Sequence, residues 1–230
     1  MSAAQRSHGG GHALFAVFLA IGSATLEDFE SSELGKLPAG FTIGTTVGDP
    51  KYSGSIATWQ TCADDHAPSG KRVVRLTETR NREEVFNLLW RDEMAPADLS
   101  LSVALHADAG KDDRGGGLVW RAQDALNFYL CRWNPLEKNL RVYCIANGRR
   151  DPLQSVTIEC DGAAWHTLAV TMKGRVIEVS FDGEKKITLA DPTYKEAGRV
   201  ALWTKGDAAS SFDDFTVTPL EPDVKKVKGT

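Results

Sequence analysis

Short runs in which apolar and polar residues alternate recur along the chain after residue 25. An alternation with a period of two is typical of a half-buried β-strand, and no stretch of useful length carries the 3.6-residue period of an amphipathic helix. The sequence therefore predicts strands at 71–78, 84–90, 99–107, 116–122, 127–133, 140–146, 155–160, 166–172, 175–182, 185–190, 199–204 and 212–217.

The residues between these runs indicate how the strands are connected. Asn147-Gly148, Lys173-Gly174 and Asp182-Gly183 favour tight hairpins, because Gly and Asn tolerate the positive φ angles of such turns. Many evenly spaced strands without helices predict a two-sheet sandwich or a barrel. The segment 40–70, rich in Gly, Ser, Thr and Asp, instead predicts long surface loops with little regular structure.

Both ends of the chain differ from this pattern. Arg6, the apolar run 13–21 and the small residues Ser23-Ala24 together describe a secretory signal over residues 1–24. The run is shorter than the about 20 residues that span a bilayer, although an uncleaved interfacial anchor is an alternative. Residues 218–230 carry Pro and Lys with few apolar groups, which predicts a flexible tail.

Composition and charge limit the classes of binding partner that we expect for the remaining domain, residues 25–217. The chain of 230 residues has a formal net charge of −4 and a pI near 5.8, and no Lys/Arg-rich block precedes the tail. These values argue against nucleic acid as a partner. We expect a monomeric protein without a transmembrane segment, located in the periplasm or outside the cell.

Export makes the four cysteines candidates for disulfides. If residues 134–141 form the tip of a hairpin, Cys131 and Cys144 stand directly opposite each other on one face, within bridging distance. Cys62 and Cys160 would then form the second pair. Four free thiols are the alternative.

The run 127–134 divides into two faces, because successive side chains of a strand point to opposite sides. One face carries Phe128, Leu130, Arg132 and Asn134, and the other carries Tyr129, Cys131 and Trp133. The same hairpin places Arg132 opposite Tyr143 and Asn134 opposite Arg141. A row of Arg, Asn and Tyr suits a polar binding face, whereas an Arg132–Glu137 surface ion pair worth under about 1 kcal/mol is the alternative.

Three stretches resemble known families. WHTLAVTMKGRVIEVSFDG (165–183) resembles the strand, turn and strand of laminin-G-like and concanavalin-A-like jelly rolls. GGLVWRAQDALNFYLCRWNPLEKNLRVY (116–143) and EAGRVALWTKGDAASSFDDFTV (196–217) resemble secreted bacterial domains of the 3-keto-disaccharide hydrolase family, and the region of Trp59 and 67–73 is more loosely similar. The resemblance implies an all-β, two-sheet antiparallel jelly-roll sandwich. Cys131 and Cys144 depart from the family pattern.

The resemblance also implies a function. We expect a glycan-recognition domain that binds saccharide on its concave face, through planar polar groups and an aromatic ring. The substrate-binding residues implied are Arg121, Asn134, Asn139, Trp203 and Asp207. An active 3-keto-glycoside hydrolase or lyase is one alternative, with Glu137 as the base and Arg132 or Lys205 stabilising an enolate. A laminin-G-like adhesion module is another.

Metal and hydrolase motifs add little to this interpretation. Glu30 and Asp213 resemble the ligands of a structural calcium ion in related sandwiches, and we expect either that ion or no cofactor. His-Glu-x-x-His, Gly-x-Ser-x-Gly and the Glu-x-Asp-x-x-Glu pattern of glucanases are missing from the sequence. His166, which follows Trp165 at the start of a strand, is expected to pack structurally.

Overall fold

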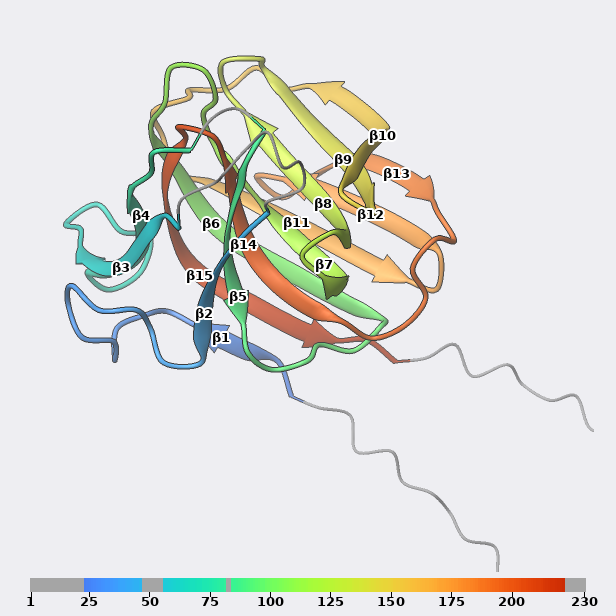
Figure 1. The fold of residues 1–230 in the computed structure, drawn as a ribbon, viewed down its shortest axis with the longest axis horizontal. Coiled ribbons are helices and arrows are strands. Elements are labelled where there is room, and N and C mark those ends of the chain that lie inside the picture. The colour runs from blue at the N-terminus through green and yellow to red at the C-terminus, as the bar shows by residue number, and fades with distance from the viewer. Residues whose placement is uncertain (1–22, 47–55, 82–83, 222–230) are drawn as a thin grey trace, which may run out of the picture.

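The computed structural model describes residues 23–46, 56–81 and 84–221, and every regular element in these ranges is a β-strand. The strands form two antiparallel sheets that lie face to face (Figure 1). The eight-stranded sheet has the order β13 (Glu184–Ala190), β12 (Val176–Phe181), β11 (His166–Lys173), β6 (Leu99–Ala109), β15 (Ala209–Pro219), β4 (Arg72–Glu78) and β3 (Thr58–Ala63), with β1 (Thr25–Glu27) also paired to β15. The seven-stranded sheet has the order β10 (Arg149–Thr157), β9 (Asn139–Ala146), β8 (Asn127–Asn134), β7 (Gly116–Asp124), β14 (Arg199–Lys205), β5 (Phe86–Arg91) and β2 (Phe41–Thr45).

Strand alternation decides which side chains fill the space between the sheets. On β8, Tyr129, Cys131 and Trp133 are fully buried in the main core, as the sequence pattern predicts. Phe128 and Leu130 point the other way, into a second apolar cluster on the outer face of the seven-stranded sheet. This outer apolar cluster consists of Phe86, Leu88, Trp90, Val119, Ala122, Phe128, Leu130, Tyr143, Ile145, Ala201 and Trp203.

The β8–β9 hairpin has a different register from the one predicted. Its loop is Pro135–Lys138, so that Asn134 pairs with Asn139 and Arg132 pairs with Arg141. Cys131 consequently pairs with Val142, while Cys144 pairs with Tyr129. The two cysteines are therefore diagonal rather than opposite neighbours.

All four cysteines are free thiols, so the predicted disulfides are wrong. For Cys131 and Cys144 the reason is the hairpin register. Cys62 lies on β3, and Cys160 is exposed in the connection from β10 to β11.

Most predicted strands are present within a few residues, with differences at two places. The sequence predicts loops over 40–70, but β2 and β3 lie in this segment, because Phe41 on β2 and Trp59 on β3 are buried in the core. The strand expected at 155–160 is β10, which begins at Arg149 and carries Pro152. A proline is tolerated there because β10 is the edge of its sheet.

Two predicted turns have the expected backbone conformation. Asn147 and Gly148 have φ angles of 51° and 76°, and Asp182 and Gly183 have φ angles of 50° and 77°. Positive φ at both central residues is the requirement of a type I′ turn, which matches the twist of the flanking strands. The dipeptides therefore fix these two hairpins locally.

The predicted secretory signal falls almost entirely outside the described residues, as does the tail beyond Glu221. Strand β15 extends to Pro219, and the Leu220 N–H donates to the carbonyl of Asp98 over 3.0 Å. The ordered domain thus continues past the predicted boundary at residue 217. Within the described ranges, no helix has the length and apolar character needed to cross a bilayer.

Candidate functional site

A group of charged and amide side chains gathers at one end of the outer face of the seven-stranded sheet. Arg132 and Asn134 come from β8, Asn139 from β9, Lys205 from β14, Glu137 from the β8–β9 loop and Asp113 from the β6–β7 connection. Hydrogen bonds and ion pairs join all of these six residues, which we call the Arg132 cluster. Of the predicted site residues, the structure brings Arg132, Asn134, Glu137, Asn139 and Lys205 together.

Arg132 is held by a bidentate contact. Its Nη2 and Nη1 donate to the two carboxylate oxygens of Glu137, over 2.7 and 3.2 Å, and Nη2 also donates to Oδ1 of Asn139 over 3.1 Å. Fork-like pairing of this kind fixes both the position and the plane of a guanidinium group. The orientation of Glu137 is therefore determined by Arg132.

Asp113 connects the two cations of the cluster. Its carboxylate accepts a hydrogen bond from Nδ2 of Asn134 over 2.7 Å and lies 2.8 Å from Nζ of Lys205. Nη1 of Arg132 is 3.8 Å away. Sequence reasoning missed Asp113, because it is one of two adjacent aspartates in a polar connection and nothing in the pattern distinguishes it from Asp112.

The loop of the hairpin turns Glu137 back over the sheet. Oδ1 of Asn134 accepts the N–H groups of Leu136 and Glu137, over 2.9 and 3.1 Å. This is the local turn that an Asn side chain favours, and Lys138 completes it with a φ angle of 51°. The sequence Asn-Pro-Leu-Glu-Lys thus encodes the placement of Glu137.

Burial separates the cluster into an inner part and a rim. The side chains of Arg132, Asp113 and Lys205 are 2%, 4% and 10% exposed, whereas that of Glu137 is 42% exposed. Arg141, on β9, is 37% exposed, and its Nη1 lies 3.4 Å from the Glu137 carboxylate. A molecule that approaches from solvent therefore meets Glu137 and Arg141, while the buried residues hold them in place.

The electrostatics keep Glu137 ionised. Burial raises the pKa of its carboxyl group, but hydrogen bonds from Arg132 and Asn139 and the charges of Arg132 and Arg141 outweigh this effect and lower the pKa to about 2. At neutral pH Glu137 is thus a carboxylate with little tendency to take up a proton. It is better suited to accepting hydrogen bonds than to acting as a base.

Asp207 has a supporting position. Its carboxylate accepts the backbone N–H groups of Lys111, Asp112 and Asp113, over 2.7, 3.2 and 2.8 Å. Burial raises its pKa and these backbone hydrogen bonds lower it, with a net decrease. Asp207 therefore holds the β6–β7 connection in the conformation that places Asp113 in the Arg132 cluster. Its carboxylate is occupied by these backbone contacts and is not presented to a ligand.

Arg121 is not brought to the cluster. Along β7 it is about 13 Å from Gly117, the residue that pairs with Arg132, at about 3.3 Å per residue. Its guanidinium donates to the carbonyls of Ala97 and Tyr194, over 2.8 and 2.6 Å, and to Asp98 over 3.2 Å. These hydrogen bonds link the connection between β5 and β6 to the connection between β13 and β14.

Trp203 lies in the same cross-strand row as Gly117 and Arg132, but only 1% of it is exposed. Its ring packs edge-on against Phe86 at a centroid distance of 5.2 Å, within the outer apolar cluster. The ring is therefore engaged in packing. Nε1 of Trp203 and Nε of Arg132 are among the buried N–H donors that have no hydrogen-bond partner in the described residues.

Both candidate calcium ligands accept backbone N–H groups at the start of β4 or in the connection before it. Oε1 of Glu30 accepts the N–H groups of Lys71 and Arg72, over 2.7 and 2.6 Å, and Oδ2 of Asp213 accepts the N–H of Ser69 over 3.2 Å. Asp213 is fully buried, and this burial raises its pKa to about 6. Within the described ranges, no group of three or more His, Cys, Asp or Glu side chains is placed to hold a metal ion.

His166 packs as expected. Its ring stacks on Phe181 at 5.0 Å and meets the edge of Trp133 at 4.9 Å. Its nitrogens lie 2.7 Å from Asp182 and 2.7 Å from the carbonyl of Asp161. All of these contacts are internal, which confirms a structural role for this histidine.

The chain resembles several solved structures in its fold. A carbohydrate-binding module of family 66 from Bacillus subtilis superposes with a TM-score of 0.59 at 17% identity, over 78% of this chain and 95% of that one. For the cellulose-induced protein Cip1 the TM-score is 0.61 at 14% identity, over 85% and 97% of the two chains. For a Bacillus licheniformis β-glucanase it is 0.54 at 12% identity, over 87% and 99%.

A scan against protein-family models finds no match, and neither does a search of curated proteins. The structural likenesses establish the fold: the chain is an all-β, two-sheet antiparallel sandwich of the jelly-roll, galectin-like and glucanase-like type. The predicted fold class is confirmed. Identities of this size carry no functional assignment, so function has to be argued from the site.

Proposed function

We propose that this chain is a saccharide-binding β-sandwich and that the Arg132 cluster forms its binding site. One observation carries the proposal: a buried, charged network on the outer face of a sheet ends in two side chains that solvent can reach, Glu137 and Arg141. Burying charges costs free energy, and buried ion pairs are often no more stabilising than apolar residues of the same size. A role in binding accounts for a network that stability alone does not require.

The groups of the cluster suit the hydroxyl groups of a sugar. A carboxylate accepts hydrogen bonds, a guanidinium donates them in one plane, and the amide of Asn139 does both. Glu137 and Arg141 offer the first two at the rim, and Asn139 lies beside them at 7% exposure. The names of two similar folds, a carbohydrate-binding module and a β-glucanase, support the same ligand class.

Elimination or hydrolysis of a 3-keto-glycoside is the second candidate, and it rests on the resemblance of residues 116–143 to the 3-keto-disaccharide hydrolase family. The pairing of Arg132 with Glu137 and the nearby Lys205 favour it, because a cation next to a base stabilises an enolate. The low pKa of Glu137 argues against it. Recognition of saccharide is therefore the leading proposal.

Binding can be tested on a glycan array and by calorimetry with the full chain. We expect Glu137→Gln and Arg132→Lys to weaken binding by about tenfold or more, equivalent to at least about 1.4 kcal/mol. Arg149→Ala is the matched control, because it removes a guanidinium from the same sheet whose side chain is 79% exposed. Equal affinity in all four proteins would exclude the Arg132 cluster as the site, and capture of envelope proteins without any glycan would favour an adhesion module.

Catalysis has a separate test. The purified chain is incubated with a 3-keto-disaccharide, and loss of the ketone and release of reducing sugar are followed. Turnover that falls in Glu137→Gln would establish the enzyme. Binding without turnover would establish the recognition domain.

We also propose that the chain is exported and monomeric, on the basis of the pattern of residues 1–24 and the composition of the chain. Amino-terminal sequencing of the protein recovered from cells tests the first point, and we expect cleavage after Ala24. A mature protein that begins at Met1 or Ser2 would contradict it. Light scattering of the purified chain tests whether it is a monomer, and the mass of a dimer would contradict the proposal.

A structural calcium ion near Glu30 and Asp213 is a further proposal. The oxygen donors there suit a hard cation, and a cation would offset the cost of ionising the buried Asp213, although other ligands would have to come from backbone carbonyls or water. We expect added Ca²⁺ to raise the melting temperature of the wild type but not of Asp213→Asn. Melting of the wild type that is indifferent to Ca²⁺ and to chelator would contradict the proposal.

A further inference from the structure

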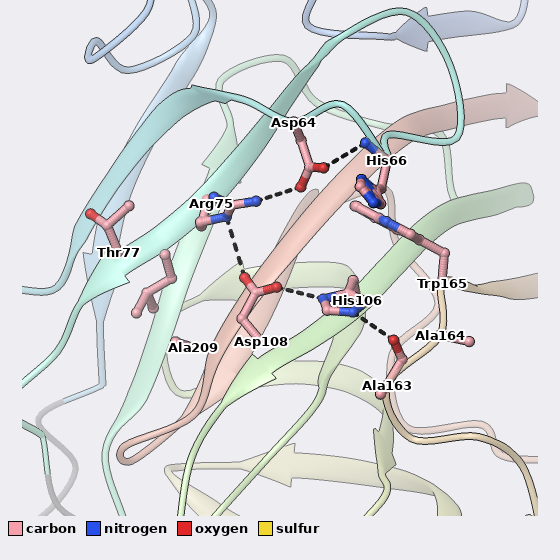
Figure 2. Close-up of a pocket in the computed structure, with 11 residues that line it drawn as sticks. Asp64, His66, Arg75, Thr77, His106, Asp108, Ala163, Ala164, Trp165 and Ala209 are labelled. Carbon is pink, nitrogen blue, oxygen red and sulfur yellow. Dashed lines mark hydrogen bonds and ion pairs between the residues drawn. The ribbon is translucent and has the colours of Figure 1, made fainter.

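A pocket opens on the side of the sandwich opposite the Arg132 cluster, on the outer face of the eight-stranded sheet. Its volume is about 620 Å³, which lies within the about 300–1,000 Å³ typical of small-molecule sites. Polar side chains and one tryptophan line it, as Figure 2 shows. The residues used below are Asp64, His66, Arg75, His106, Asp108 and Trp165.

The strand register fixes the floor of this pocket. Arg75 on β4 pairs with Ser211 on β15, and Ser211 pairs with His106 on β6. The neighbours of these residues along each strand, Val74 and Leu105 among them, are fully buried in the core between the sheets. Arg75, Ser211 and His106 therefore form a row that faces away from the core.

A continuous chain of hydrogen bonds holds this row in place. Arg75 donates from Nη2 to Asp64 and from Nε to the hydroxyl of Ser211, both over 2.6 Å. Ser211 donates to Asp108 over 2.6 Å, and the other oxygen of Asp108 lies 2.5 Å from Nδ1 of His106. The polar groups are therefore preorganised, which reduces the entropy lost when a ligand binds.

The charged side chains of the pocket are already paired with one another. Asp64 lies 2.6 Å from Nη2 of Arg75, and Asp108 lies 3.4 Å from Nε of Arg75 and 2.5 Å from Nδ1 of His106. A ligand with a net charge therefore finds no unpaired opposite charge among Arg75, Asp64 and Asp108, whereas a neutral ligand with many hydroxyl groups finds both donors and acceptors.

An aromatic wall completes the pocket. Trp165 is only partly buried, and its ring lies 5.5 Å from the ring of His106 at an interplanar angle of 40°. The exposed His66 lines the pocket as well, and Figure 2 shows it on the same side as Trp165. Partly exposed aromatic rings beside planar polar groups can pack against the C–H groups of a sugar ring while the polar groups bind its hydroxyls.

We propose that this pocket binds a neutral saccharide unit, so that the sandwich has two saccharide sites, one on the outer face of each sheet. Trp165 packs against the sugar ring, and Arg75, with donors left over from its contacts to Asp64 and Ser211, binds the hydroxyl groups. The side chains of Arg75 and Asp64 are 27% and 18% exposed, so solvent reaches both of them at the pocket. The second site does not depend on the Arg132 cluster, so either proposal can fail alone.

Fluorine NMR of the full chain labelled with 5-fluorotryptophan tests the proposal. The chain contains six tryptophans, and Trp165→Phe assigns the signal of Trp165. The probes are the neutral disaccharides maltose, cellobiose, sucrose and lactose, with glucuronate and glucosamine as charged probes. We expect the Trp165 signal to shift saturably with at least one neutral disaccharide and to stay unchanged with both charged probes.

Two variants sharpen the result. Arg75→Lys keeps the charge but loses the planar fork, and we expect about tenfold weaker binding. Gln60→Ala is the matched control, because Gln60 pairs with Arg75 across β3 and β4 but does not line the pocket. The fluorine signals of the five other tryptophans report whether each variant is folded.

A Trp165 signal that no neutral disaccharide shifts up to about 50 mM, a concentration that would mostly fill a site with a Kd of about 10 mM, would overturn the proposal. A tighter response to glucuronate or glucosamine would overturn it too, because it would show a charged ligand. If Trp165 responds while Glu137→Gln leaves binding intact, the second site stands and the proposed role of the Arg132 cluster fails. The reverse pattern would retain the Arg132 cluster alone.

Discussion

Two buried arginines, Arg121 and Arg132, lie on neighbouring strands of the seven-stranded sheet, and their surroundings differ in kind. Arg121 is 1% exposed and donates to two backbone carbonyls and Asp98. Arg132 is 2% exposed and is surrounded by side chains, while its Nε has no partner among the described residues. The guanidinium of Arg121 links segments of the backbone, and that of Arg132 links polar side chains.

The difference shows that burial of a charge does not by itself mark a functional site. Buried backbone carbonyls in the connections between strands need hydrogen-bond donors. An arginine that supplies these donors has a structural role. An arginine that orients a half-exposed carboxylate sets the chemistry that a ligand meets. The predictions below separate these two tasks.

The largest effect is expected for Asp113→Ala. This change leaves Arg132 and Lys205 buried without their shared carboxylate, and breaking a buried pair in this way costs about 3–5 kcal/mol of unfolding free energy. Urea denaturation measures it. Asp151→Ala, which removes a carboxylate that is 42% exposed and pairs with the exposed Arg149, is the control and should cost about 1 kcal/mol or less. Equal losses of unfolding free energy in the two variants would mean that the charges of the Arg132 cluster interact no more strongly than exposed surface charges.

Arg121→Ala should cost about 2–3 kcal/mol, because two carbonyls lose a charged donor. Saccharide affinity, measured by calorimetry at a temperature where the variant is folded, should equal that of the wild type. A loss of affinity with an intact fold would return Arg121 to the binding site that the sequence resemblance implied.

Asp207→Asn should have a smaller effect on stability, about 1 kcal/mol, because an amide oxygen can replace part of the carboxylate's three backbone contacts. Affinity should nevertheless fall, since the connection that carries Asp113 loosens. Hydrogen exchange of the Lys111, Asp112 and Asp113 amides reports the loosening. If neither the amide hydrogen exchange nor the saccharide affinity changes, Asp207 does not support the Arg132 cluster.

The smallest expected effect is the pH dependence that Glu137 contributes, because its side chain is 42% exposed and solvent screens its ion pairs. Its pKa in the folded chain, about 2, lies below its ordinary value of 4.5, so the stabilisation is complete above about pH 4.5 and is lost as the pH falls through 2. Glu137→Gln should therefore lose less stability than the wild type between pH 4.5 and 2. The midpoint of urea denaturation at several pH values measures this difference, and parallel curves would contradict the lowered pKa.

The sequence predicted the sheets well, because strand alternation and Asn-Gly or Asp-Gly turns are local signals. It assigned the faces of β8 correctly, since alternation depends on the order of residues alone. The partner of each residue depends instead on the length of the loop, and misplacing the centre of the 131–144 hairpin was enough to produce a false Cys131–Cys144 disulfide. Strands β2 and β3 were missed because Thr and Gly dilute their apolar signal.

The sequence predicted part of the Arg132 cluster. Arg132, Asn134, Glu137 and Asn139 lie within one hairpin, so a single sequence segment brings them together. Asp113 and Arg141 could not be singled out, since the role of Asp113 depends on a connection between the two sheets and that of Arg141 on the register. The pocket around Arg75 and His106 combines β4, β6 and β15, which no local pattern reveals.

The central claim is that Arg132, unlike Arg121, belongs to a saccharide site. Proton–nitrogen NMR of the arginine Nε–H groups tests it directly, with the signals assigned by Arg132→Lys and Arg121→Lys and the full chain titrated with maltose, cellobiose, sucrose and lactose. Saccharide hydroxyls that reach Glu137 compete with Arg132 for its carboxylate, so the Arg132 signal should shift saturably while the Arg121 signal stays in place. A titration in which neither signal moves, or both move alike, would contradict the account.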